Sequence, residues 1–346
     1  MKKTIIKTIT GLLMGCFLTA GGYTAENQKL AQSGFQFLSV VSDARAVAMA
    51  EAMTSLQIGS SALFFNPAGM AEMTGMIDMT ASTNQWIADI THNTFSLALS
   101  PSGGNYGVLG FSMQSVDYGE FFGTRVDKTV DQGYVDTEVF ELTALAVGMG
   151  YAKRLTDRFS VGGQVRWVRQ DLGESVIPKI ETGLDSLGEA VLDTSGQTIS
   201  NELTPLAFDF GTQFKTGYKS LVFGMSVRNF SKEIKYVEEG FQLPLVFNLG
   251  ISMDLMDFME NPALDQSLIL TIDASHYRSH AEQLKFGLDY RLMNMLSVRG
   301  GYITSNDESG FSFGMGVSYF GAAFDYAYSP FGVFDKVQRM TVRFSI

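Results

Sequence analysis

The sequence predicts an all-β protein, a 14-stranded antiparallel transmembrane β-barrel with a small, partly helical N-terminal plug in its lumen. Three observations predict this fold: large apolar residues alternate with small or polar ones, the pattern recurs about fourteen times after residue 74, and the connectors alternate in length. A strand points successive side chains to opposite faces, so each segment has one apolar and one polar face. Such strands are typical of membrane-spanning barrels.

The alternation is clearest in the last third of the chain. In the segments 245–255, 268–274, 284–292, 311–319 and 340–346, every second residue, starting from the first, is apolar. The residues between them are mostly small or polar, and Gly, Ser and Thr are common. A soluble β-sandwich also alternates, but its polar face meets bulk water and is usually charged. Small polar residues therefore favour a face that lines a lumen.

Fourteen segments fit the pattern, and an even number brings both termini to the same side of the membrane. The mean hydropathy of +0.09 and the apolar content of 45% fit strands in which half of the residues face a polar lumen. The predicted strands, which form a barrel over residues 74–346, are 74–83, 90–100, 106–116, 139–152, 158–170, 203–215, 220–230, 244–256, 266–277, 283–292, 295–304, 310–319, 320–328 and 338–346.

The predicted connectors indicate the orientation of the barrel. The longer ones, such as 117–138 and 171–202, belong to one end, and the short ones, such as 101–105 and 153–157, belong to the other. Outer-membrane barrels have short periplasmic turns and longer external loops. We therefore expect a bacterial outer-membrane protein, in contact with membrane lipid, with both termini on the periplasmic side. The two long connectors are acidic, which fits either a solvated surface or a docking surface for a secreted partner.

Residues 1–25 have the features of a secretory signal peptide. Lys2, Lys3 and Lys7 precede a mostly apolar stretch that is too short to span a bilayer, and small residues follow it. Cys16, the only cysteine of the chain, lies in this segment; its lipidation and the cleavage position stay open. A mature chain without cysteine would have no disulfide and no thiolate metal site.

The chain is acidic. Its 25 basic and 36 acidic residues give a formal net charge of −11. Removal of residues 1–25 deletes three lysines and no acidic residue, which makes the net charge −14. Proteins bind nucleic acid through cationic residues that neutralise phosphates, so nucleic acid is not an expected partner.

Residues 26–73 do not alternate, and we expect them to form the plug. Residues 43–56 are rich in Ala, Met and Glu, which favours a helix with Ser42 or Asp43 as its N-cap. Asn66 can cap a second helix, because Pro67 at its first position loses only an N–H that has no partner. Our hypothesis is that Asp43 and Arg45 anchor the plug to charges in the lumen.

The inward face of the predicted strands carries charges of both signs. We expect these charges to pair across strands or with the plug, and a polar path or ligand anchor is the alternative. The predicted lumen charges are Asp209, Asp254, Asp273, Asp289, Asp325, Arg166, Arg291, Arg299, Arg339 and Arg343.

Nothing in the sequence predicts an enzyme, a cofactor or a metal site. The three histidines are His92, His276 and His280, and only the last two are near each other. Neither belongs to a nucleophile elbow or a metal-ligand motif. Gly148-Met149-Gly150 and Gly314-Met315-Gly316 follow strand spacing and are not phosphate loops, which need a following helix. We expect these glycines to let the lumen contents approach the wall.

Two stretches resemble the PorV/PorQ family of outer-membrane proteins. Residues 34–46 (GFQFLSVVSDARA) match the "FL…DARA" pattern of that family. Residues 48–52 (AMAEA) and 61–70 (SALFFNPAGM) are similar to its "GMGEA" and "FxNPAGL" elements, with Ala50 where the family usually has glycine. The Asn66-Pro67-Ala68 element is shared with FadL-type transporters of hydrophobic compounds.

This resemblance implies a 14-stranded FadL-type barrel whose N-terminal segment fills the lumen. It also implies a role in type IX protein secretion, in which such barrels bind secreted cargo or pass it to the secretion machinery. The alternative function is FadL-like transport of hydrophobic small molecules. That function predicts an apolar pocket near the external end and a lateral opening, for which Pro244 or the Gly162-Gly163 pair are candidate kinks.

Overall fold

The computed structural model of the chain describes residues 33–126, 130–179, 193–236, 239–259, 265–279, 281–305, 310–332 and 334–346. The predicted signal peptide with Cys16, the first residues of the predicted plug and His280 lie outside the described residues. No helix in the described ranges is long and apolar enough to cross a membrane.

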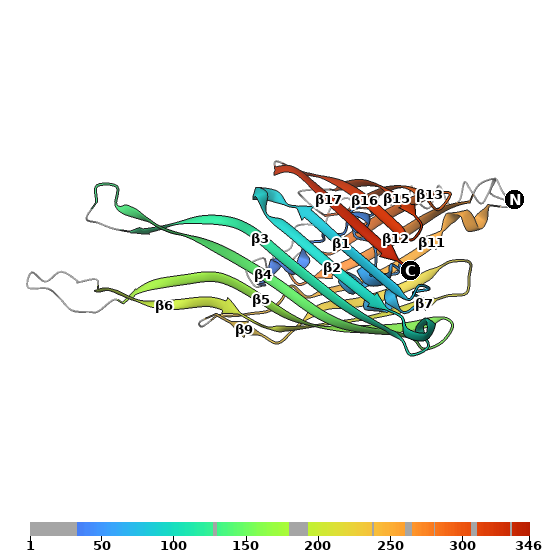
Figure 1. Ribbon diagram of the computed structural model, residues 1–346, viewed down its shortest axis with the longest axis horizontal. Helices are drawn as coiled ribbons and strands as arrows, with labels where there is room; N and C mark the ends of the chain where they lie inside the picture. The colour runs from blue at the N-terminus through green and yellow to red at the C-terminus, as the bar shows by residue number, and fades with distance from the viewer. Residues whose placement is uncertain are drawn as a thin grey trace, which may run out of the picture.

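The strands form a closed antiparallel barrel (Figure 1), which confirms the predicted fold class. Apart from β6 and β7, which both pair with β5, consecutive barrel strands pair with each other, and β1 pairs with β17 to close the cylinder. The barrel strands are β1 (Ile77–Gln85), β2 (Thr91–Leu99), β3 (Val108–Val126), β4 (Tyr134–Arg154), β5 (Phe159–Lys179), β6 (Asp193–Leu203), β7 (Leu206–Lys215), β8 (Val222–Phe230), β11 (Val246–Asp254), β12 (Gln266–Tyr277), β13 (Gln283–Leu292), β14 (Leu296–Ile303), β15 (Phe311–Tyr319), β16 (Ala322–Phe331) and β17 (Phe334–Ser345).

These strands fill fourteen positions around the barrel because β6 and β7 share one. Both pair with β5, β6 with its outer part and β7 with its inner part. Pro205 separates them, since proline has no N–H to donate to a ladder. Its carbonyl oxygen nevertheless accepts a hydrogen bond from the Val168 N–H at 3.0 Å, so β5 stays paired across the break.

The two faces of the wall differ as the alternation predicts. Outward side chains such as Val298, Met315 and Val342 are 64%, 62% and 55% exposed. Their strand neighbours Arg299 and Thr341 are 5% and 2% exposed and face the lumen. An apolar outer surface on a closed barrel, whose backbone groups are all paired, is stable in lipid and not in water. This architecture identifies a transmembrane barrel of the bacterial outer membrane.

The prediction that residues 117–138 and 171–202 are loops is wrong for most of the described residues. β3, β4 and β5 run on far beyond the other strands, and with β6 they form two long hairpins that project from one end of the barrel (Figure 1). Bulges interrupt the β3–β4 ladder between Asp117 and Glu120 and the β5–β6 ladder between Asp171 and Glu174. A bulge shifts which side chains face which side, so the apolar alternation is lost there although the strands continue.

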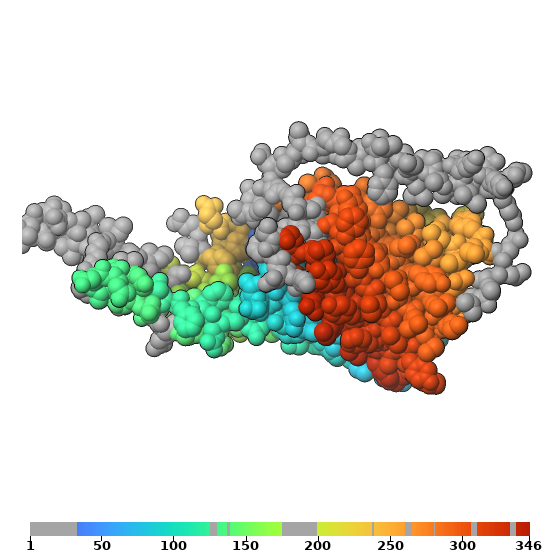
Figure 2. Space-filling view, turned by 90° about the horizontal axis from the view of Figure 1, so that it is seen from above, coloured from blue at the N-terminus to red at the C-terminus, as the bar shows by residue number. Residues whose placement is uncertain are grey.

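The hairpins define the external end of the barrel, because external connectors are the long ones. The C-terminus lies toward the opposite end, where short turns such as 155–158 and 320–321 join the strands (Figure 1). Seen from above in Figure 2, the C-terminal part of the barrel, coloured orange to red, forms a continuous surface beside the earlier strands. The described C-terminus is therefore periplasmic.

Residues 33–73, which we call the plug, are folded inside the barrel. They contain η2 (Gln36–Ser39), α2 (Ala44–Ala48), η3 (Gly59–Phe64) and η4 (Pro67–Met70). The predicted helix over residues 43–56 is limited to α2, because Ala50 and Glu51 have left-handed φ angles of 53° and 62° that end it. Short elements outside the plug are η5 (Ile87–Asp89), η6 (Pro101–Gly104), β9 (Ile234–Lys235), β10 (Gly240–Phe241) and η7 (Leu255–Phe258).

Candidate functional site

A network of buried charges holds one side of the plug. The Arg45 guanidinium, on α2, lies 3.1 Å from the Asp289 carboxylate on β13. Arg299 on β14 also contacts Asp289 at 3.1 Å and donates a second hydrogen bond to Asp325 on β16. Arg291 approaches Asp289 at 3.7 Å. A buried carboxylate among three guanidiniums is compensated, whereas removal of one partner would leave an uncompensated charge.

A second ion pair joins the plug to the same side of the barrel. The Lys285 ammonium on β13 lies 2.7 Å from the Glu51 carboxylate and donates to the Tyr277 hydroxyl at 2.8 Å. Burial opposes ionisation of Glu51, but the attraction of the Lys285 charge outweighs it and lowers the Glu51 pKa. Glu51 is therefore ionised at neutral pH and fixes the end of the α2 turn against the wall.

Asp43 forms its hydrogen bonds within the plug and not with the barrel wall. Its carboxylate accepts a hydrogen bond from the Ala46 N–H at 2.8 Å, as the N-cap of α2, and another from the Ser61 hydroxyl at 3.1 Å. Burial raises the Asp43 pKa, and the hydrogen bond from Ala46 partly opposes that rise. The structure thus places only Arg45 of the Asp43–Arg45 pair on a lumen charge, and Asp43 ties α2 to η3.

The Asn66-Pro67-Ala68 element holds the other side of the plug. Asn66 caps η4 by accepting a hydrogen bond from the Ala68 N–H at 3.1 Å, and Pro67 occupies the first turn. The Asn66 amide donates to the carbonyl oxygens of Thr54, at 2.6 Å, and Thr212 on β7, at 3.1 Å. One buried side chain therefore joins two parts of the plug to the barrel wall.

Glycines on the inward face give the plug its space. A Cβ at Gly162 would lie 2.5 Å from the Ala68 nitrogen, and one at Gly301 would lie 2.3 Å from the Ala50 nitrogen. Gly150 and Gly314, predicted to admit the lumen contents, lie against Leu63 and Ala48 of the plug. Inward glycines on β3, β4, β5, β7, β8, β11, β13, β14 and β15 contact the plug in this way: Gly110, Gly150, Gly162, Gly211, Gly224, Gly250, Gly287, Gly301 and Gly314.

The remaining predicted lumen charges are distributed along the wall. Asp209 pairs with Arg166 at 2.8 Å, and Arg343 contacts Asp78 at 3.3 Å. Asp273 accepts a hydrogen bond from the Thr54 N–H at 3.0 Å. The Arg339 guanidinium donates to the Val41 carbonyl oxygen at 2.9 Å.

Asp254 differs from the predicted lumen charges. It ends β11 and caps η7, accepting hydrogen bonds from the Met256 and Leu268 N–H groups at 2.9 and 3.0 Å. Strand parity points the residue inward, but the strand stops there, so the carboxylate belongs to the periplasmic turn.

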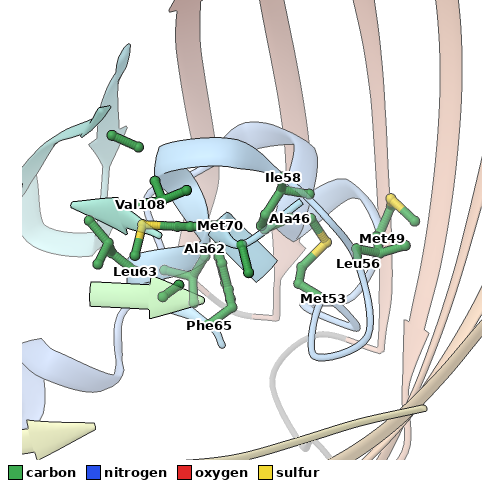
Figure 3. Close-up of a cluster of buried hydrophobic side chains, with 14 of the residues drawn as sticks. Ala46, Met49, Met53, Leu56, Ile58, Ala62, Leu63, Phe65, Met70 and Val108 are labelled. Atoms are coloured by element: carbon green, nitrogen blue, oxygen red, sulfur yellow. The ribbon is translucent and has the colours of Figure 1, made fainter. Parts of the chain in front are cut away.

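The inner half of the lumen is packed with apolar plug side chains. Met49, Met53 and Leu56 form one part of this cluster, and Leu63 and Met70 form another next to Val108 of the wall (Figure 3). Flexible methionines fill irregular space between the plug backbone and the strands.

The outer half of the lumen holds a second apolar cluster, which the sequence interpretation missed. Phe35, Phe37 and Leu38 of the plug are 2–3% exposed there. The Gln114 amide donates a hydrogen bond to the Phe37 carbonyl oxygen at 2.8 Å. We call this group the outer apolar cluster. Its other buried members, from β3, β4, β5, β7 and the segment before β11, are Val116, Ala144, Ala146, Val168, Ala207 and Leu243.

The outer apolar cluster borders a cavity at the end of β8. This cavity has a volume of about 350 Å³, and Asn229, Leu243, Leu245 and Arg278 are among its lining residues. The β8–β11 ladder ends at the pair Arg228–Val246. Beyond it, the Asn229 side chain donates to the Pro244 carbonyl oxygen at 2.8 Å in place of a backbone bond. The seam between these strands is thus closed by a side chain.

The two candidate kinks have different surroundings. Pro244 lies just before β11, where the ladder to β8 has ended. β5 continues without interruption through Gly162 and Gly163. Pro67 and Ala68 of the plug pack directly against Gly162, so glycine is needed there for close packing and does not bend the strand.

The histidines show no catalytic or metal-binding arrangement in the described residues. His92 is 2% exposed beside the Trp86 ring, and His276 forms an exposed pair with Glu282 at 3.0 Å. No group of three His, Cys, Asp or Glu side chains in the described ranges could hold a metal ion.

Comparisons with known proteins identify the fold. No family model and no curated protein matches the chain. The toluene transporter TbuX of Ralstonia pickettii matches with a TM-score of 0.55 and 14% identity, over 88% of this chain and 98% of that one. The monoaromatic hydrocarbon channel CymD matches with a TM-score of 0.56 and 12% identity, over 88% and 97%. A FadL homologue of Pseudomonas aeruginosa matches with a TM-score of 0.51 and 13% identity, over 88% and 98%.

These likenesses span nearly the whole length of the compared proteins, at identities that establish the fold and nothing finer. All three are transporters, channels or FadL homologues, and none is described as an enzyme. The chain has the fold of FadL-type outer-membrane transporters.

Proposed function

We propose that this barrel binds hydrophobic small molecules at its external end and carries them across the outer membrane. The observation that supports this function best is the outer apolar cluster, in which Phe35 and Phe37 of the plug occupy a buried apolar site in the lumen. Ligand sites are mostly apolar with a few polar groups nearby. The cavity beside Leu243 lies at the same end, and its lining is mostly polar, with charged groups at Lys232, Glu233 and Arg278, so it supplies polar groups next to the apolar site.

The fold adds support. TbuX is a toluene transporter and CymD a monoaromatic hydrocarbon channel, and both share this architecture. Aromatic rings of the plug fill the cluster, so an aromatic hydrocarbon has the shape and polarity to replace them. Toluene is accordingly the first ligand to test.

Two opposite substitutions test the proposal. In Phe37→Ala, loss of the ring leaves an apolar space, which stays dry and binds aromatic molecules. Ala207→Asp puts a carboxylate into the cluster, and toluene binding should weaken by at least about tenfold, the equivalent of about 1.4 kcal/mol. Uptake of radiolabelled toluene by vesicles containing the refolded barrel measures both effects.

The expected order of uptake is Phe37→Ala above the unchanged protein and Ala207→Asp below it. Ala207→Ser is the control, because it has nearly the same size without the charge. Deletion of residues 34–70 should raise conductance in planar bilayers if the plug blocks the lumen. Toluene uptake equal to that of protein-free vesicles in all variants would contradict the proposal.

The second candidate function is binding of a secreted protein, as in type IX secretion. The feature that favours it is the projecting β3–β4 hairpin, which exposes Phe122 (78%) and the stacked pair Phe121–Phe140, with ring centroids 5.7 Å apart. Exposed aromatic side chains on a projecting hairpin are suited to a protein interface. Affinity purification from outer membranes, with the Phe122→Ser variant as control, tests it. Loss of a secreted protein from the variant sample would support docking there.

A further inference from the structure

A groove crosses the lipid-facing surface of the barrel near its periplasmic end. It has a volume of about 610 Å³, within the ~300–1,000 Å³ range of ligand pockets. Apolar outward residues of β2, β3, β4, β5 and β7 form its sides, among them Leu99, Leu109, Met149, Val165 and Phe208.

The groove exists because one outward position is a glycine. Leu109, Tyr151, Gly163 and Phe210 are successive partners across β3, β4, β5 and β7. The other three have large side chains, so Gly163 leaves a notch in the row. A Cβ at Gly163 would meet the Asp209 carbonyl oxygen at 3.5 Å and the Phe210 ring at 3.6 Å, which are ordinary contacts. The position therefore tolerates a side chain, and the notch is not required by the fold.

At two positions under the groove the strands have no inward side chain. Gly110 and Gly150 also line it, and a Cβ on either would meet Leu63 of the plug at 3.0 and 2.5 Å. Because both glycines face inward, the plug contacts the strand backbone directly on the side opposite the groove.

Polar groups lie at the periplasmic end of the groove. The Tyr151 hydroxyl donates to the Tyr106 carbonyl oxygen at 2.7 Å, and Tyr106 is 74% exposed in the adjacent turn. Tyrosines of this kind mark the membrane interface. Lys153 shares the outward face of β4 with Tyr151, about 7 Å along the strand toward the turn. No described carboxylate forms an ion pair with Lys153.

We propose that this groove binds a glycerophospholipid of the periplasmic leaflet, with one acyl chain in the notch at Gly163 and its phosphate at Lys153. The surface is apolar where the bilayer interior lies and cationic where the headgroups lie, which matches an amphiphile in that leaflet. An ammonium that can reach the phosphate adds electrostatic attraction near an anionic surface. The bound lipid would cover the wall where the plug is in contact with the backbone.

Native mass spectrometry of the full barrel, purified in mild detergent from vesicles of phosphatidylethanolamine and phosphatidylglycerol, tests the proposal. We expect the unchanged protein to retain one phospholipid and Gly163→Leu to retain roughly tenfold less, because the side chain fills the notch. Lys153→Gln should lower retention of either lipid severalfold. Gly300→Leu is the matched control: Gly300 also faces outward, with the nearest heavy atom 4.0 Å from its added Cβ.

Unheated gel migration checks that each variant is folded. Equal lipid retention by folded Gly163→Leu and the unchanged protein would overturn the proposal, as would retention lost equally in Gly300→Leu. Displacement of the lipid by toluene, with no dependence on Lys153, would assign the groove to a hydrocarbon and also overturn it. These results do not depend on toluene uptake, so the lipid site and the proposed transport can fail separately.

Discussion

The plug is held by two walls that use different chemistry. On β13–β16, Arg45 enters a network of buried charges around Asp289. On β4, β5 and β7, η4 packs against glycines, and Asn66 supplies hydrogen bonds to backbone groups. A buried ion network adds little net stability but makes any misplaced arrangement costly. The β13–β16 wall thus selects the position of the plug through buried charges. The β4–β7 wall holds the plug mainly through close packing and the Asn66 hydrogen bonds, and its ion pairs with the plug involve Glu72, which contacts Lys215 at 2.8 Å and Arg154 at 3.6 Å.

The largest expected effect is on the β13–β16 wall. Asp289→Asn removes the charge that compensates Arg45 and Arg299, and breaking a buried pair costs about 3–5 kcal/mol. Urea unfolding in lipid vesicles measures the free energy of unfolding. Glu120→Gln, on an exposed hairpin, is the control for loss of one carboxylate. Equal stabilities of the two variants would show that the network does not hold the plug.

Gly301→Val tests close packing within the β13–β16 wall. Its Cβ would lie 2.3 Å from the Ala50 nitrogen, and overpacking of this kind costs about 3 kcal/mol. Gly300→Val, one residue away on the outward face, should leave stability nearly unchanged. Thermal unfolding followed by gel migration compares the two. A similar loss in both would mean that close contact with the plug is not what requires glycine at position 301.

On the β4–β7 wall, Asn66→Ala should cost about 2 kcal/mol, since it removes a helix cap and leaves the Thr54 and Thr212 carbonyl oxygens without this donor. The same change at the exposed turn residue Asn105 is the control. The expected loss is smaller than that of Asp289→Asn. The opposite order in urea unfolding would reverse the roles assigned to the two walls.

The smallest effect is a gain. Ala50 has a φ of 53°, a conformation that costs most L-residues about 1–2 kcal/mol and costs glycine little. Ala50→Gly should therefore raise the free energy of unfolding by about 1 kcal/mol. Ala48→Gly, inside α2, should lower it by about the same amount. If Ala50→Gly destabilises the protein, the alanine methyl group makes a contact worth more than the strain.

The strand positions could be predicted because the membrane imposes period-two alternation on every spanning segment. In Leu284–Leu292 and Met340–Ile346 every second residue is apolar, and these residues form the outward faces of the strands. The fit of Asn66 and Pro67 to a helix start also follows from local chemistry, since a cap and a first-turn proline act within a few residues.

What the sequence could not reveal depends on contacts between distant residues. Bulges interrupt the β3–β4 and β5–β6 ladders, so these strands carry no regular alternation to read. Phe35 and Phe37 lie in a segment without periodicity, and only the packing against Val116 and Ala146 shows that they fill an apolar site. The notch at Gly163 becomes visible only when the residues of four strands are aligned side by side.

The closure of the cylinder has a consequence for how the molecule assembles. β1 pairs with β17, and the Ile77 and Ile346 backbones exchange hydrogen bonds at 2.9 Å in each direction. β1 and β17 are farther apart in the sequence than any other pair of neighbouring strands. Their pairing therefore has the largest loop-closure cost. Loss of β17 would leave the backbone edges of β1 and β16 unsatisfied in hydrocarbon. Completion of the last ladder therefore removes the last unpaired strand edges of the barrel.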